Sequence, residues 1–281
     1  MNVSEIIRQF ENTITTDDII CAAGVLIFGG WLLRTSLGRK SLADSIPRRH
    51  NMSVYVPFIS LLIWFVVVSA AMSATNVLLP GLLGWKKALA DNLILCAGAI
   101  IGIAVIVFIA KKFFADGIKG LGLNMGTIYK DFPVAVMNLA SIWPMIIFML
   151  MLTILTGQFI YGRDFKMPQH EELEIVTMYP QISLRLLIIT VTVVVVPVFE
   201  EMLFRGLFQT LIRSFFVGPW RSVVISSVVF VMAHPTIAHW PALFVLSMCI
   251  SYSYEKSGSL FRPIFIHSLF NGLSIAVTLY Q

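Results

Sequence analysis

The chain has 281 residues, of which 58% are hydrophobic and only 12% are charged. Soluble domains carry roughly 25% charged residues, so a water-soluble fold of this size would lack the polar side chains needed to cover its surface. The net charge of +5 does not imply a nucleic-acid partner, because basic loops beside anionic lipid account for it. With a mean hydropathy of +0.86, the composition excludes an ordinary soluble domain and predicts an integral membrane protein.

The apolar runs are long and unbroken, which predicts an all-α bundle rather than a barrel. A spanning helix takes about 20 residues, and we expect about eight spanning helices in a polytopic bundle. In chain order the runs are 19–33, 54–74, 92–110, 134–156, 184–214, 222–237, 241–254 and 263–280. The polar stretch 158–183 is expected to be a solvated loop with a short surface helix.

Basic residues cluster after the first, third, fifth and seventh runs, which are alternate loops. Loops rich in Lys and Arg stay in the cytoplasm, so this pattern predicts that both termini lie outside. Lys86 and Lys87 fall on the opposite side and weaken the pattern. We expect a multi-pass protein of a bacterial cell membrane, with the lipid bilayer as its surroundings.

The fifth run contains two adjacent carboxylates and a guanidinium, those of Glu200, Glu201 and Arg205. Charged groups at the centre of a bilayer cost about 2.5–3.5 kcal/mol each on insertion scales, so they need partners or a wet cavity. Glu201 and Arg205 are four residues apart on one helix face, which predicts an ion pair. Glu200 points about 100° away around the helix and is expected to face a cavity. A cluster that only tightens the bundle is the alternative interpretation.

Polar residues recur at matching depths in the sixth and eighth runs, as His234, His267 and Asn271. A turn near Gly218 makes runs five and six a hairpin, with Glu201 17 residues before it and His234 16 residues after it. At about 1.5 Å per residue, both lie about 25 Å from the turn. His267 and Asn271 share one face of the last run. We therefore expect three helices to bring these groups together.

Pro197 and Pro235 stand next to this expected site. Each proline leaves a backbone carbonyl without its usual helical partner, and within a membrane such groups are tolerated inside protein or beside water. A hydrated cavity and a simple kink for packing are both compatible with the two prolines.

This set of residues suits hydrolysis by water. A carboxylate beside a neutral histidine can take a proton from water, and a second histidine with an amide can donate hydrogen bonds to an oxyanion. No serine or cysteine is placed as an obvious nucleophile, which favours water over acyl transfer. The alternative is a zinc ion held by Glu200, His234 and His267. We favour a metal-free site without a cofactor, because no helix carries two ligands at metal spacing.

Three short motifs occur in order within these apolar helices: Glu200-Glu201-x-x-x-Arg205, Phe230-x-x-x-His234 and His267-x-x-x-Asn271. Together they resemble the motifs of the CPBP (CAAX protease and bacteriocin-processing, or Abi) family, over roughly residues 180–278. The resemblance implies an eight-helix intramembrane peptidase core. In it, Glu200 and His234 would activate water, His267 and Asn271 would stabilise the oxyanion, and Glu201 and Arg205 would support them.

We divide the chain into N-terminal transmembrane helices with the polar loop, residues 1–179, and a catalytic membrane core of the CPBP type, residues 180–281. The expected function is intramembrane endopeptidase activity, of the type that processes prenylated CAAX proteins, on a membrane-associated protein or peptide. Two other classes stay open. One is a non-catalytic immunity or scaffold protein of the same fold. The other is an ion-coupled transporter, which the lack of an internal repeat disfavours.

Overall fold

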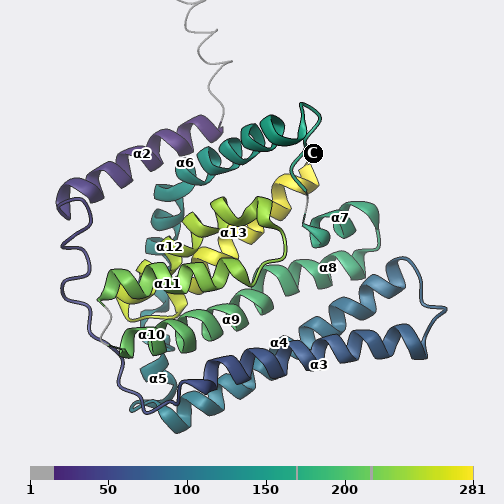
Figure 1. The fold of residues 1–281 in the computed structure, drawn as a ribbon, viewed down its shortest axis with the longest axis horizontal. Helices are drawn as coiled ribbons and strands as arrows, with labels where there is room; N and C mark the ends of the chain where they lie inside the picture. The colour runs from purple at the N-terminus through teal and green to yellow at the C-terminus, as the bar shows by residue number, and fades with distance from the viewer. Residues whose placement is uncertain (1–15, 169, 216–217, 281) are drawn as a thin grey trace, which may run out of the picture.

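The structure is a computed structural model that describes residues 16–168, 170–215 and 218–280 (Figure 1). Over these residues it is helical, with one isolated antiparallel bridge between His50 and Phe114. The longer helices are α2 (Thr16–Arg34), α3 (Tyr55–Leu78), α4 (Trp85–Phe113), α6 (Ile128–Tyr161), α11 (Pro219–Met232), α12 (Trp240–Ser257) and α13 (Phe261–Tyr280). Shorter elements are α5 (Gly117–Leu121), η1 (Met125–Thr127), α7 (Glu171–Met178) and η4 (Ile237–His239).

Residues 182–214 form one continuous helical rod in which two π-helical stretches interrupt the α-helix. Its parts are α8 (Ile182–Thr190), the π-helical η2 (Val191–Val195), α9 (Val196–Glu201), the π-helical η3 (Met202–Gln209) and α10 (Thr210–Ser214). The rod packs between the antiparallel pair α3–α4 on one side and α11 and α13 on the other, while α6 packs on α12 and α13 (Figure 1). Every residue of η3 is buried, so the rod is the central element of the bundle.

A close approach of α4 to the rod fixes the position of α9. A Cβ atom added at Gly102 would overlap the ring of Phe199, so a glycine is required where the two helices meet. The Phe199 ring also packs on Trp64 of α3, with ring centroids 4.9 Å apart. This packing anchors the residue that directly precedes the two adjacent glutamates.

Each of the eight predicted runs corresponds to a helix, but only part of the membrane prediction is confirmed. Four segments are long and apolar enough to cross a membrane, 55–78, 85–113, 125–161 and 182–214, and α11 is apolar but shorter. The structure thus supports an all-helical integral membrane protein, whereas the number of eight spans is not confirmed. The short surface helix expected within 158–183 is α7.

The sixth run ends earlier than predicted, at Met232 rather than at residue 237. His234 therefore follows α11 instead of lying inside it. The reason is Pro235, since a residue that precedes proline is disfavoured in the helical conformation. The amide of His234 accordingly bonds to the carbonyl of Val231 in a tightened last turn.

The loops with many basic residues meet at one end of the bundle, which we call the basic end. The indole of Trp220 donates to Gly38 O, the Ser45 hydroxyl bonds to Glu255, and the amide of Leu260 bonds to Gly122 O. These contacts join loops that are distant in sequence. Basic residues at this end include Arg34, Arg39, Lys40, Arg48, Arg49, Lys111, Lys112, Lys119, Arg213, Arg221, Lys256 and Arg262.

This arrangement predicts that all loops of the basic end lie on the same side of the membrane. In a protein whose native cysteines are replaced by alanine, Lys119→Cys and Lys256→Cys should be shielded from an impermeant maleimide in intact cells. Gly81→Cys, in the α3–α4 turn at the opposite end, should be labelled. Labelling of all three positions from one side would contradict the membrane placement of α3 and α4.

Candidate active site

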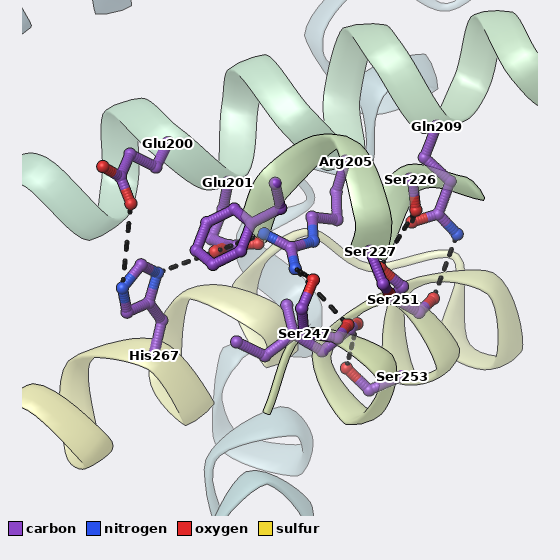
Figure 2. Close-up of polar contacts among 12 residues, drawn as sticks. Glu200, Glu201, Arg205, Gln209, Ser226, Ser227, Ser247, Ser251, Ser253 and His267 are labelled. Atoms are coloured by element: carbon purple, nitrogen blue, oxygen red, sulfur yellow. Dashed lines mark hydrogen bonds and ion pairs between the residues drawn. The ribbon is translucent and has the colours of Figure 1, made fainter. Parts of the chain in front are cut away.

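Glu201 connects two helices through one buried carboxylate (Figure 2). Its side chain has no exposed surface, and Oε1 accepts hydrogen bonds from Arg205 Nη1 at 2.9 Å and from His267 Nδ1 at 2.7 Å. The ion pair predicted from the four-residue spacing is therefore present. Because a carboxylate only accepts, His267 Nδ1 carries a hydrogen. His267 Nε2 then accepts a hydrogen bond when the ring is neutral and donates one when it is charged.

Glu200 faces a different direction from Glu201, as their adjacent positions on a helix require. Its side chain is 22% exposed, and its Oε2 lies 3.8 Å from His267 Nε2. Figure 2 shows the His267 ring between the two carboxylates. The structure thus brings Glu200, Glu201, Arg205 and His267 together from the rod and α13.

His234 lies next to this group without a hydrogen bond or ion pair to Glu200 in the described structure. Its Nδ1 donates to Phe230 O at 2.9 Å, which leaves Nε2 unprotonated in the neutral ring. The Phe230 ring contacts both histidines, with its centroid 4.6 Å from that of His234 and 5.9 Å from that of His267. Phe230 therefore spaces the two imidazoles.

Asn271 replaces a backbone hydrogen bond that Pro197 cannot make. In the π-helical turn, the amide of Val196 bonds to Val191 O, so the next carbonyl, Thr192 O, would pair with residue 197. Proline has no N–H, and Asn271 Nδ2 donates to Thr192 O at 2.9 Å instead. An amide group has two N–H donors, so the second hydrogen of Asn271 is not used by this bond.

A buried polar seam continues from Arg205 toward the basic end (Figure 2). Arg205 Nη2 donates to the Ser247 hydroxyl at 2.7 Å, and its guanidinium lies 4.5 Å from the Phe230 ring centroid. One turn further, Gln209 Nε2 donates to Ser251 O at 3.0 Å. Arg213 and Glu255 form an ion pair at 2.9 Å beyond that. Apart from Arg205, these residues were not selected from the sequence. The sequence pattern that could have identified them is a polar residue at every fourth position of two apolar helices. These positions are 201, 205, 209 and 213 on one helix and 247, 251 and 255 on the other.

A second pair of histidines lies near the group, with His170 directly before α7 and His239 at the end of η4. His239 Nε2 donates to Pro168 O at 2.8 Å, so its Nδ1 accepts from His170 Nε2, at 2.7 Å. The pKa of His170 is lowered to about 4, mainly by burial and also by the neighbouring His239 and His234. Burial raises the pKa of Glu172 of α7, and the nearby Glu200 charge adds to this effect. His170 and Glu172 are therefore close enough to Glu200 and His234 to interact with them electrostatically.

The three residues of the alternative zinc site have suitable donor atoms. Glu200, His234 and His267 could each bind a metal ion through an oxygen or nitrogen atom. Each imidazole donates its Nδ1 hydrogen to a carboxylate or a carbonyl oxygen, as metal-binding histidines usually do. Among the residues that the structure describes, however, no group of three His, Cys, Asp or Glu side chains is placed to hold one metal ion. The metal-free site and the zinc alternative both stay predictions.

A family model matches residues 182–273, and its description is type II CAAX prenyl endopeptidase Rce1-like. This segment runs from α8 into α13 and contains all six residues selected from the sequence. No curated protein and no solved structure matches the chain.

The buried ion pair between Glu201 and Arg205 should contribute strongly to stability. Arg205→Ala leaves the Glu201 carboxylate buried without its cation, and breaking a buried pair costs around 3–5 kcal/mol. We expect a clearly lower thermal midpoint in detergent for this variant. The double variant Glu201→Gln/Arg205→Met should recover much of the loss. A single variant as stable as the parent would show that the pair does not hold the bundle together.

The lowered pKa of His170 should make the stability of the protein depend on pH. The pKa of His170 falls from its ordinary value of 6.5 to about 4 in the folded protein, so the unfolded chain binds a proton first on acidification. Keeping His170 neutral in the folded protein costs no free energy of unfolding above pH 6.5. As the pH falls from 6.5 toward 4, the unfolded chain gains a proton that the folded protein does not, and the free energy of unfolding decreases. The thermal midpoint of the parent should therefore fall relative to that of His170→Gln over this range. Glu172→Gln, whose parent group has a raised pKa, should show the opposite trend. Parallel curves for the parent and His170→Gln would refute the assignment.

Proposed function

Because a family model described as type II CAAX prenyl endopeptidase Rce1-like matches residues 182–273, we propose that this protein is an intramembrane endopeptidase. It hydrolyses a peptide bond of a membrane-associated protein or peptide, with or without a prenyl group. We further propose that all eight apolar helices lie in a bacterial cell membrane. The main support is the His267 ring held between two carboxylates, one buried and paired and the other partly exposed.

In the proposed reaction, Glu200 is the general base. It takes a proton from a water molecule, and the hydroxide attacks the carbonyl carbon of the scissile bond. His234 has Nδ1 bonded to Phe230 O, so its Nε2 is free to accept a hydrogen bond from the same water. Glu200 then returns its proton to the leaving amine, which completes the hydrolysis without a covalent intermediate.

The oxyanion needs hydrogen-bond donors at a fixed position. We assign this role to His267 Nε2 in the charged ring and to the second N–H of Asn271. Glu201 holds Nδ1 of His267 at 2.7 Å and balances the charge of the imidazolium. Arg205, which also donates to the Ser247 hydroxyl, in turn holds Glu201. The paired carboxylate thus orients the ring, and the partly exposed one exchanges protons with water.

Removing the proposed base tests this function directly. Glu200→Gln and His234→Ala should each lower the cleavage rate of tagged membrane peptides in detergent by about 10²–10⁴-fold. Both should keep the thermal midpoint of the parent. Asp44→Asn, which removes an exposed carboxylate at the basic end, is the control and should retain full activity. Turnover at the parent rate in either site variant would end the assignment.

Metal dependence is tested in the same assay. We expect cleavage to continue after treatment with a chelator and dialysis, and the active protein to contain less than stoichiometric metal. Loss of activity with the chelator, restored by zinc, would overturn the metal-free mechanism without changing the family assignment.

A further inference from the structure

A pocket of about 490 Å³ opens at the basic end, away from the candidate active site. It lies between the segment after α2 and the first turn of α11. Its lining consists of Arg39, Leu42, Ala43, Gly218, Pro219, Trp220 and Arg221. Two of these residues are arginines, and none carries a carboxylate.

The floor of this pocket is held by hydrogen bonds and aromatic packing. Trp220 Nε1 donates to Gly38 O at 3.1 Å, and the indole stacks on Tyr252 with ring centroids 5.6 Å apart. The Tyr252 hydroxyl also accepts a hydrogen bond from Trp31 Nε1 at 2.9 Å. Leu42 is buried beneath the segment. Three segments distant in sequence therefore build the pocket as a defined part of the fold.

The two arginines differ from other arginines of the basic end. Arg213 pairs with Glu255, and Arg262 pairs with Asp131. Arg39 and Arg221 are exposed, and within the described residues no ion pair or hydrogen bond of their side chains is formed. Two guanidinium groups at one pocket repel each other, so a bound anion would lower the free energy of this arrangement. Guanidinium groups bind phosphate oxygens through paired N–H donors.

Exposed apolar side chains shortly before Arg39 in the chain indicate the source of that anion. Leu33 and Leu37, which precede Arg39, are 85% and 72% exposed. Tryptophan is enriched where lipid headgroups meet the acyl chains. A ligand with an anionic head and an apolar tail would cover both the arginines and the leucines. A free phosphate ion would leave the leucines exposed.

We propose that this pocket binds the phosphate of an anionic phospholipid, with Arg39 and Arg221 on the headgroup beside Trp220. The bound lipid tethers the segment after α2 to the turn that starts α11. That turn joins the rod, which carries Glu200, to the helix that precedes His234. The proposal does not depend on peptidase activity.

Native mass spectrometry of the full chain, released from mixed phosphatidylglycerol and phosphatidylcholine nanodiscs, tests this binding. The parent should retain phosphatidylglycerol in preference to phosphatidylcholine. Arg39→Gln/Arg221→Gln should weaken that retention by roughly tenfold or more, because charged hydrogen bonds are lost. Arg34→Gln/Lys40→Gln removes the same charge from exposed positions outside the pocket and should retain most of the binding.

Further variants and ligands distinguish specific lipid binding from a general charge effect and from binding of free phosphate. Arg39→Lys/Arg221→Lys should recover part of the selectivity, and all variants should melt as the parent does in lipid-free detergent. Equal losses in both Gln double variants would mean a general charge effect and overturn the proposal. Unchanged binding in Arg39→Gln/Arg221→Gln would overturn it as well. Retention of inorganic phosphate or glycerol 3-phosphate without preference for the lipid would assign the pocket to a free phosphate instead.

Discussion

The buried carboxylate of Glu201 is the interaction on which the site depends. An isolated charge of this kind in a low-dielectric interior is too costly to persist, so its position requires Arg205 on the same helix and His267 on α13. Arg205 in turn binds the Ser247 hydroxyl of α12. One carboxylate therefore fixes the relative positions of three helices. Because its hydrogen bond selects the Nδ1–H form of His267, it also determines which nitrogen of that ring faces Glu200.

The irregular winding of the rod has an equally direct cause. Pro197 removes an amide where η2 turns into α9, and the free carbonyl of Thr192 receives Asn271 instead. A local break in one helix thus becomes a specific contact with another. π-helical turns of this kind occur frequently at functional sites, and here two of them flank Glu200 and Glu201. In this way the break binds α13 to the rod beside the residues proposed to react.

Sequence patterns predicted the features that follow from one helix alone. The apolar runs located the helices, and the spacing of Glu201 and Arg205 predicted their ion pair. Depth from the turn placed Glu201 and His234 near each other, although His234 lies past the end of α11 because of Pro235. Contacts between side chains of different helices were not predictable, because they depend on how each helix is rotated about its axis when the helices pack. Thus the sequence did not reveal that His267 binds Glu201, that Phe230 spaces the histidines, or that His170 and His239 lie nearby. The seam through Gln209 and Ser251 was detectable as four-residue polar spacing on two apolar helices.

The central claim is that Glu201 and His267 act as one unit in hydrolysis. A double-mutant cycle on kcat/KM, with Glu201→Gln, His267→Ala and the double variant, measures this most directly, because residues that act as a unit show strongly non-additive losses. The double variant is expected to be about as slow as His267→Ala alone, with all three proteins still folded in detergent. Losses that add in full would mean that the two side chains contribute independently and that Glu201 does not orient the ring.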